Sequence, residues 1–223
     1  MTDLSRRHAA MSLGALGGLA MLGPGRVALA AALERTPIQT LGPFYPLVRP
    51  LDEDADLTVT QGQPGRAQGQ VVHVVGRVLN RKGEPVRDAT LEVWQANSRG
   101  RYAHPGDINP APLDPAFQGF ARLRTDAEGR YRFKTIKPGA YPVNPMNPRV
   151  VRTPHIHFDV AGKADRIVTQ MYFPGEALND TDLVLQRVGA GQRDSVVATL
   201  LAALPDVAEG ELAYGWEIVL NDG

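Results

Sequence analysis

The pattern of apolar and polar residues changes at position 71, and from there it predicts β-strands. Apolar residues run almost without a break from 71 to 79, and the later apolar segments are short and partly alternating. We expect residues 126–129, with their Asp and Gly, to form a hairpin turn between two of these strands. The pattern predicts an all-β fold, an antiparallel β-sandwich with long loops. The expected strands are residues 71–79, 89–95, 120–125, 130–136, 150–161, 166–173 and 213–220.

Two other regions depart from this strand pattern. Apolar residues recur at helical spacing within residues 193–204, which predicts one helix in the C-terminal half of the chain. Residues 31–70 are rich in Pro, Gly and Asp without a clear period, so we expect an extended N-terminal arm. Residues 71–223 then form a single sandwich domain, since no internal repeat or second domain is visible.

The first thirty residues have the features of an export signal. Ser5, Arg6 and Arg7 precede an apolar run, and residues 28–30 have the small side chains of a signal-peptidase site. The adjacent arginines favour the twin-arginine route, and an ordinary secretory signal or a basic N-terminus is the alternative. Gly and Pro interrupt the apolar run, which argues against a membrane span. We therefore expect a periplasmic or otherwise exported protein, cytoplasmic if the signal is not functional.

Composition restricts the chemistry that the chain can perform. Lys plus Arg and Asp plus Glu each number 24, and no basic stripe stands out, so nucleic acid is not an expected partner. The chain has no cysteine, which excludes disulfides, thiolate metal sites and cysteine nucleophiles. A metal ion would have to be held by His, Tyr, Asp or Glu.

His155 and His157 are the most informative pair in the chain. They are two residues apart in a predicted strand, so both imidazoles should project from the same face. The pair alone fits a metal site and ordinary packing equally well. Asp159 lies on the same face and could complete a two-histidine, one-carboxylate Fe(II) site. Residues i and i+4 of a straight strand lie about 13 Å apart, too far for one ion.

Tyrosine and arginine side chains are further candidates for the site. Tyr102 and Tyr141 each follow a predicted strand, and a trivalent cation would favour their phenolate forms although the pKa of a free phenol is about 10. Tyr141 could instead be a corner tyrosine whose hydroxyl bonds the backbone. Arg152 has the opposite strand parity to the histidines, but Pro154 between them can kink the chain. A surface position for Arg152 is the alternative.

Several sequence blocks together resemble the intradiol ring-cleavage dioxygenases, especially the protocatechuate 3,4-dioxygenase branch. The resemblance covers roughly residues 36–175, and its specificity comes from the joint occurrence of the blocks in family order. The blocks are residues 36–44, 91–97 with 100–102, 113–120, 135–142, 152–158 and 170–173.

The resemblance implies a non-haem Fe(III) centre and a ring-cleavage reaction. Its ligands would be Tyr102, Tyr141, His155 and His157, which match the family's iron ligands. Arg152 would act in catalysis beside the substrate, and Tyr141 would also act in catalysis by leaving the metal and taking up a substrate proton. The implied reaction uses O2 to split a catechol-type aromatic between its two hydroxyl-bearing carbons, which gives a muconate-type diacid. The residues that match the family's substrate pocket are Thr40, Gly42, Pro43 and Gln170.

Two departures and one rival interpretation remain. Val143 stands where relatives often have Trp, and residues 144–151 do not match the family pattern, which leaves the substrate undetermined. The segments around residues 75–86, 125–133 and 138–141 also resemble transthyretin-like and carboxypeptidase-regulatory-like binding modules, which are mostly non-catalytic. That likeness accounts for Tyr141 but not for the histidine pair. Because one chain carries both the pocket segment and the ligands, a homo-oligomer with composite sites is an open expectation.

Overall fold

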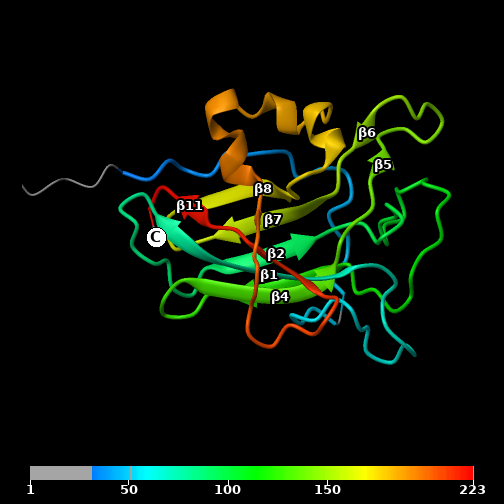
Figure 1. Ribbon diagram of the computed structural model, residues 1–223, viewed down its shortest axis with the longest axis horizontal. Coiled ribbons are helices and arrows are strands. Elements are labelled where there is room, and N and C mark those ends of the chain that lie inside the picture. Colours follow the sequence, from blue (N-terminus) through cyan, green and yellow to red (C-terminus); the bar gives the residue numbers. More distant parts are fainter. Residues whose placement is uncertain (1–31, 51, 223) are drawn as a thin grey trace, which may run out of the picture. The chain divides into compact units, whose positions relative to one another are not determined.

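The computed structural model describes residues 32–50 and 52–222, so the predicted export signal at 1–30 lies outside the described residues. Two β-sheets form the fold, as Figure 1 shows, and the all-β prediction is confirmed. In the described residues no helix is long and apolar enough to cross a membrane. The strands are β1 Val71–Asn80, β2 Thr90–Trp94, β3 Phe120–Arg124, β4 Arg130–Ile136, β5 Tyr141–Pro142, β6 Val151–Arg152, β7 His155–Ala161, β8 Arg166–Tyr172, β9 Thr199–Leu200, β10 Leu212–Gly215 and β11 Ile218–Leu220; the 3-10 helices are η1 Ala177–Asp180, η2 Leu185–Arg187 and η3 Ala190–Val196.

The core lies between the two sheets, and strand alternation decides which residues enter it. One sheet has the order β3-β2-β7-β8, and the other combines β11, β1, β10 and β9 with β4 paired to β1. In β7, Ile156, Phe158 and Val160 belong to the core, and the Phe158 ring contacts those of Phe133 and Trp216 at centroid distances of 5.9 and 4.9 Å. Each such buried side chain stabilises the fold by about 1.5–3 kcal/mol. The odd positions of β7 therefore face away from the core, onto the outer side of its sheet.

The strand pairing differs from the prediction in two respects. β1 pairs in parallel with β10 and β11, so this sheet is mixed rather than purely antiparallel. Residues 126–129 turn tightly, but β3 before them pairs with β2 and β4 after them pairs with β1. The turn therefore crosses from one sheet to the other instead of closing a hairpin. The residues of a turn do not determine which strand the following strand pairs with.

The predicted helix at residues 193–204 is wrong. The 3-10 helix η3 ends at Val196, and the chain continues as the extended strand β9. Val196 and Ala198 are buried, whereas Val197 between them is partly exposed and Thr199 is exposed, so burial here alternates as in a strand. The backbone N–H of Ala198 donates to the carbonyl of Tyr172 at 2.9 Å, which fixes this extended path beside β8. Figure 1 shows the coiled segments (yellow to orange) next to β8.

The described residues before β1, at 32–50 and 52–70, form no helix or strand of their own and run along the edges of both sheets. Its backbone N–H groups at Gln39 and Leu57 donate to carbonyls of Val168 in β8 and Lys134 in β4, each at 2.8 Å. The carbonyl of Glu53 accepts from Arg122 in β3. These contacts cover strand edges that would otherwise be unpaired. Figure 1 also shows long loops gathered at the end of the sheets where β5 and β6 lie.

Candidate metal centre and substrate pocket

The histidine pair lies on the outer face of its sheet, as strand parity predicts. His155 and His157 are almost completely buried, and their Nε2 atoms are 3.2 Å apart. His155 Nδ1 lies 2.6 Å from the carbonyl oxygen of Thr153, so a neutral His155 donates its proton there and keeps the Nε2 lone pair free. Burial lowers the pKa of both imidazoles well below the ordinary value. Two neutral nitrogen donors therefore point at one small region.

His157 is held by packing rather than by a hydrogen bond. The Trp94 ring stacks on its imidazole with centroids 4.9 Å apart and planes 9° from parallel. On the arm, Gly42 has a positive φ of 75°, and a Cβ atom there would lie 3.0 Å from His157 Cε1. His157 Nδ1 has no hydrogen-bond partner among the described residues. Trp94 and Gly42 thus fix the ring orientation that a hydrogen bond usually fixes.

The two tyrosines bring their hydroxyl groups to the same region. Tyr102 lies in the loop after β2, Tyr141 begins β5, and their rings meet edge to face at a centroid distance of 5.5 Å. Tyr141 Oη is 3.4 Å from His155 Nε2, and the buried Tyr102 Oη has no hydrogen-bond partner among the described residues. Tyr141 is therefore not a corner tyrosine. Tyr131, instead, donates to the backbone carbonyl of Trp216 at 2.8 Å.

Two glycines allow the tyrosine loops to pack backbone against backbone. A Cβ atom on Gly100 would lie 2.4 Å from the carbonyl oxygen of Ala140, and one on Gly139 would lie 2.5 Å from that of Ser98. The Gly139 N–H also donates to the carbonyl of Asn97 at 2.9 Å. These close contacts set the distance between the segments that carry Tyr102 and Tyr141.

The four donors fit one hard trivalent cation. Metal–ligand bonds to nitrogen and oxygen are about 2.1 Å, so neighbouring ligands at right angles lie about 3 Å apart, close to the 3.2 and 3.4 Å separations seen here. Burial raises the pKa of both tyrosines, and that of Tyr102 well above its usual value, so phenolates need a compensating positive charge. A ferric ion supplies that charge and prefers phenolate oxygen. A bound cation would also give a partner to the Tyr102 hydroxyl, which is buried without a hydrogen bond among the described residues.

The described residues do not support a two-histidine, one-carboxylate site. No group of three or more His, Cys, Asp or Glu side chains in that part of the chain could hold a metal ion. Asp159, on the same strand as the histidines, accepts a hydrogen bond from Arg166 Nε at 2.8 Å. Half of the donor set consists instead of the phenols of Tyr102 and Tyr141.

Arg152 is buried beside the four donors and is not a surface residue. Pro154 separates β6 from β7, and this break turns Arg152 to the side of the sheet that carries the histidines. Its Nη2 donates to Gln170 Oε1 at 2.6 Å, and its Nε donates to Asp182 Oδ2 at 2.9 Å. Asp182 is fully buried, and no local sequence pattern marks it as a site residue. The same is true of Trp94.

The expected substrate-pocket residues lie on one side of this site. Gln170 Nε2 donates to the carbonyl oxygen of Thr40 at 3.0 Å, and the Gly42 N–H donates to Thr40 Oγ1 at 3.2 Å. Pro43 follows Gly42 and is exposed. The arm is therefore joined to the same network as Arg152. A cleft of about 440 Å³ between residues 37–40 and 184–192 lies behind this part of the arm.

Val143 and the following residues form a loop between β5 and β6. The Val143 N–H donates to the carbonyl of Val150 at 2.9 Å, which closes the loop at its base. Val143 is 58% exposed and Met146 is 85% exposed. Apolar side chains thus remain exposed on the loop directly after the ligand candidate Tyr141.

Comparison with known proteins agrees with this site. A family model described as dioxygenase matches residues 41–222. The protocatechuate 3,4-dioxygenase beta chain of Burkholderia cepacia is 47% identical over 171 residues, covering 75% of this chain and 72% of the relative. The alpha chain from the same organism is 34% identical over 180 residues, covering 74% and 84%.

Solved structures share the fold. The dioxygenase domain of a carbohydrate-binding fusion protein from Streptomyces sp. SirexAA-E superposes with a TM-score of 0.62 at 27% identity, covering 85% of this chain and 100% of that one. Catechol 1,2-dioxygenase from Acinetobacter sp. ADP1 superposes with a TM-score of 0.65 at 23% identity, covering 84% and 63%.

These relatives decide between the two interpretations of the sandwich. Relatives that match the chain include protocatechuate, catechol and hydroxyquinol dioxygenases. The family model also extends over nearly the whole described chain from residue 41 onward. The chain therefore belongs to the intradiol ring-cleavage dioxygenases and is an enzyme of that class.

Proposed function

We propose that this chain binds one non-haem Fe(III) ion through Tyr102, Tyr141, His155 and His157 and cleaves a catechol with O2 between its hydroxyl-bearing carbons. The observation that carries the proposal is the convergence of two buried imidazole nitrogens and two buried phenol oxygens with no carboxylate among them. When bound, the ion makes the catechol ring reactive toward O2. The expected product is a muconate-type diacid.

The protein side chains perform three tasks in this proposal. Tyr141 holds or accepts a proton at Oη, because its hydroxyl is within reach of the site and has no backbone partner among the described residues. The Arg152 guanidinium places a fixed positive charge where negative charge develops on the substrate. The stacked Trp94 and the arm at Gly42 hold His157 and cover the site from water.

The substrate class is supported by the relatives and remains a proposal for this chain. The most similar relatives among those compared act, by name, on protocatechuate, a carboxylated catechol. Val143 stands where relatives often have Trp, and its loop carries exposed apolar side chains. The apolar surface beside the site therefore differs from the one that a Trp side chain would form. We therefore propose a protocatechuate-like catechol as substrate, with ring substituents that meet this loop.

Oxygen consumption by iron-loaded protein against a panel of catechols tests the function. We expect uptake of O2 with at least one catechol and a diacid product identified by mass spectrometry. Iron-free protein and monophenols serve as controls and should consume none. The proposal would be overturned if iron-replete protein turned over none of the catechols. It would also be overturned if the ring were cleaved at a bond other than the one between the two hydroxyl-bearing carbons.

We also propose that residues 1–30 direct export by the twin-arginine route and that the mature chain forms a homo-oligomer. The paired arginines at 6 and 7 motivate the first statement. The likeness of this single chain to both the alpha and the beta chains of one relative motivates the second. N-terminal sequencing of secreted protein and light scattering of the purified protein test these two points. A mature N-terminus at Met1, or a monomer at working concentration, would contradict them.

A further inference from the structure

Arg152 has a buried hydrogen-bond partner, Asp182, which is not one of the proposed ligand or substrate-binding residues. The guanidinium is buried, with Nε bonded to Asp182 and Nη2 bonded to Gln170. Its third nitrogen, Nη1, has no hydrogen-bond partner among the described residues. Two nitrogens are thus used to anchor the group, and one remains available for a substrate.

Asp182 is itself held rigidly between η1 and η2. Its Oδ1 accepts from the backbone N–H groups of Val184 and Leu185, each at 2.9 Å. Its Oδ2 accepts from the Thr153 N–H at 2.9 Å and from Arg152 Nε at 2.9 Å. Three of these four donors are backbone groups, so the carboxylate position is set by the chain path and not by Arg152.

The second anchor of Arg152 is a neutral amide. Gln170 is as fully buried as Asp182, its Oε1 also accepts from the Tyr172 hydroxyl at 3.1 Å, and its Nε2 donates to Thr40 in the arm. The two anchors therefore differ in charge. The charged and fully buried Asp182 is therefore the stronger anchor, because charge-assisted hydrogen bonds are about twice as strong as neutral ones.

We propose that Asp182 is the positioning residue for Arg152: it orients the guanidinium so that Nη1 faces the catechol. The proposal rests on the proposed function, since Arg152 is taken there to stabilise charge on the substrate. Asp182 does not touch the substrate or the four donors and acts only through Arg152. The segment between β8 and β9 thus contributes to catalysis without contributing a ligand.

The test is a double-mutant cycle measured as kcat per bound iron. Asp182→Asn removes the carboxylate charge at nearly constant volume, and we expect a loss of about 10- to 100-fold in kcat. Arg152→Gln removes the guanidinium, and the double variant should be no slower than Arg152→Gln alone. Asp180→Asn is the matched control, because Asp180 is an exposed residue of η1 and makes no ion pair among the described residues.

Two results would overturn the proposal. One is an unchanged kcat per bound iron in Asp182→Asn, with only a lower melting temperature, which would show a purely structural carboxylate. The other is a full additional loss in the double variant. Crystal structures of the wild type and Asp182→Asn give a readout without activity, since the guanidinium should leave its position beside Gln170. If the wild type cleaves no catechol, the proposed function fails, and the crystal structures still decide the role of Asp182.

Discussion

Residues at the candidate metal site are fixed by different kinds of contact. His155 is oriented by a hydrogen bond to a backbone carbonyl, whereas His157 is oriented by the Trp94 ring and the backbone of Gly42. Tyr102 Oη has no hydrogen-bond partner in the described part of the chain, and Tyr141 Oη lies 3.4 Å from His155 Nε2. Removal of any one of these contacts should therefore change a different property of the site.

Removal of the Tyr141 hydroxyl should separate proton handling from iron retention. In Tyr141→Phe the ring can keep its edge-to-face contact with Tyr102, while one donor and one proton acceptor are lost. We expect slower substrate binding and product release, at least tenfold, with a smaller loss of bound iron. Stopped-flow absorbance with a catechol and iron analysis of the purified variant measure the two effects. Unchanged binding rates at full activity would contradict a role for this hydroxyl.

Gly42→Ala should disturb His157 specifically. The added Cβ would meet His157 Cε1 at 3.0 Å, and the positive φ of 75° adds backbone strain of about 1–2 kcal/mol. We expect lower iron occupancy and a shifted visible band. Gly62→Ala is the control, because Gly62 has a similar φ of 80° and nothing within 4 Å of the added Cβ. Equal iron occupancy in the two variants would show that the contact between residue 42 and His157 does not set the position of this ligand.

The candidate site residues could be selected from sequence only where they belong to local patterns. The histidine pair and Arg152 lie in one short segment, and the two tyrosines follow recognisable strands. Asp182 could not be selected, because its partner Arg152 is 30 residues away and no local pattern marks the pair. No local pattern marks Trp94 as a site residue, and only the pairing of β2 with β7 places it against His157.

At the scale of elements, the strand positions were predictable but the pairing was not. Apolar runs and turn residues locate β1, β4 and β8 to within a residue or two, whereas the strand predicted at 150–161 is divided into β6 and β7 at Pro154. Whether β4 pairs with β3 or with β1 depends on contacts between distant segments, which composition does not encode. The predicted helix failed for a related reason: spacing of 3–4 residues among apolar side chains also occurs where an irregular segment joins a short strand.

The close packing of the two tyrosine loops is a property of these elements that can be tested. Gly139→Ala would place a Cβ 2.5 Å from the carbonyl oxygen of Ser98 and 2.6 Å from the Gly100 nitrogen, so the loops must separate. We expect a loss of about 1–3 kcal/mol in the free energy of unfolding and a weaker iron–phenolate colour. Urea titration and visible absorbance measure both. Gly189 has a φ of −53° and open space around it, so Gly189→Ala should change neither the stability nor the colour. An equal loss of stability in Gly189→Ala would show that the effect of Gly139→Ala does not come from the packing of the two loops.

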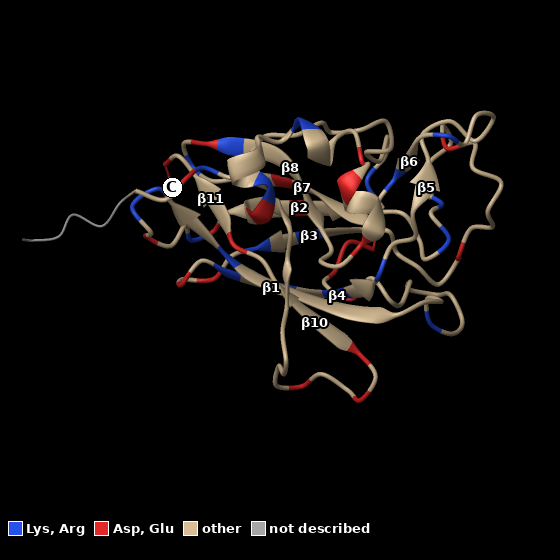
Figure 2. Ribbon diagram, turned by 45° about the horizontal axis from the view of Figure 1, so that its top comes forward, with Lys and Arg blue, Asp and Glu red and all other residues tan. Residues whose placement is uncertain are grey.

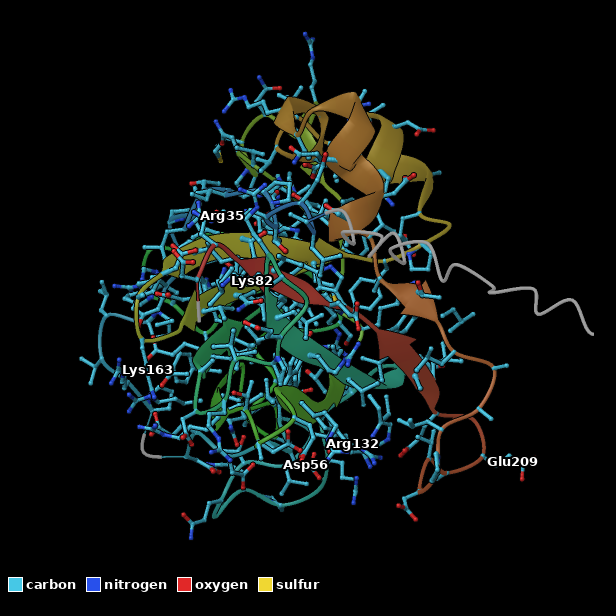
Figure 3. All side chains as sticks on the ribbon, turned by 90° about the vertical axis from the view of Figure 1, so that its left-hand side faces the viewer. Arg35, Asp56, Lys82, Arg132, Lys163 and Glu209 are labelled. Carbon is cyan, nitrogen blue, oxygen red and sulfur yellow. The ribbon has the colours of Figure 1, made fainter. Side chains whose placement is uncertain are left out.

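At the scale of the whole molecule, acidic and basic residues are interspersed over both sheets, as Figure 2 shows. One cluster joins the segment before β10 to the outer face of the sheet that contains β1 and β4. Glu211 lies 2.6 Å from His73 Nε2 and 3.0 Å from Lys134 Nζ. In Figure 3, Arg132 of β4 lies near Asp56, whereas Glu209 projects at the tip of its loop. The cluster therefore fastens the segment before β10 to β1 and β4, which come much earlier in the chain.

This cluster should make the stability of the whole fold depend on pH in the acid range. Hydrogen bonds from His73, then from Lys134, lower the pKa of Glu211 from 4.5 to about 2. Because the folded pKa is the lower one, the stabilisation is complete above about pH 4.5 and is lost as the pH falls toward 2. Glu211→Gln should therefore lower the urea midpoint at pH 7 and reduce its decline between pH 4.5 and pH 2. Glu209→Gln removes the same charge from the exposed tip of the loop and should leave the pH profile unchanged. If the urea midpoint of Glu211→Gln declined between pH 4.5 and pH 2 as steeply as that of the wild type, Glu211 would not link this segment to the sheet.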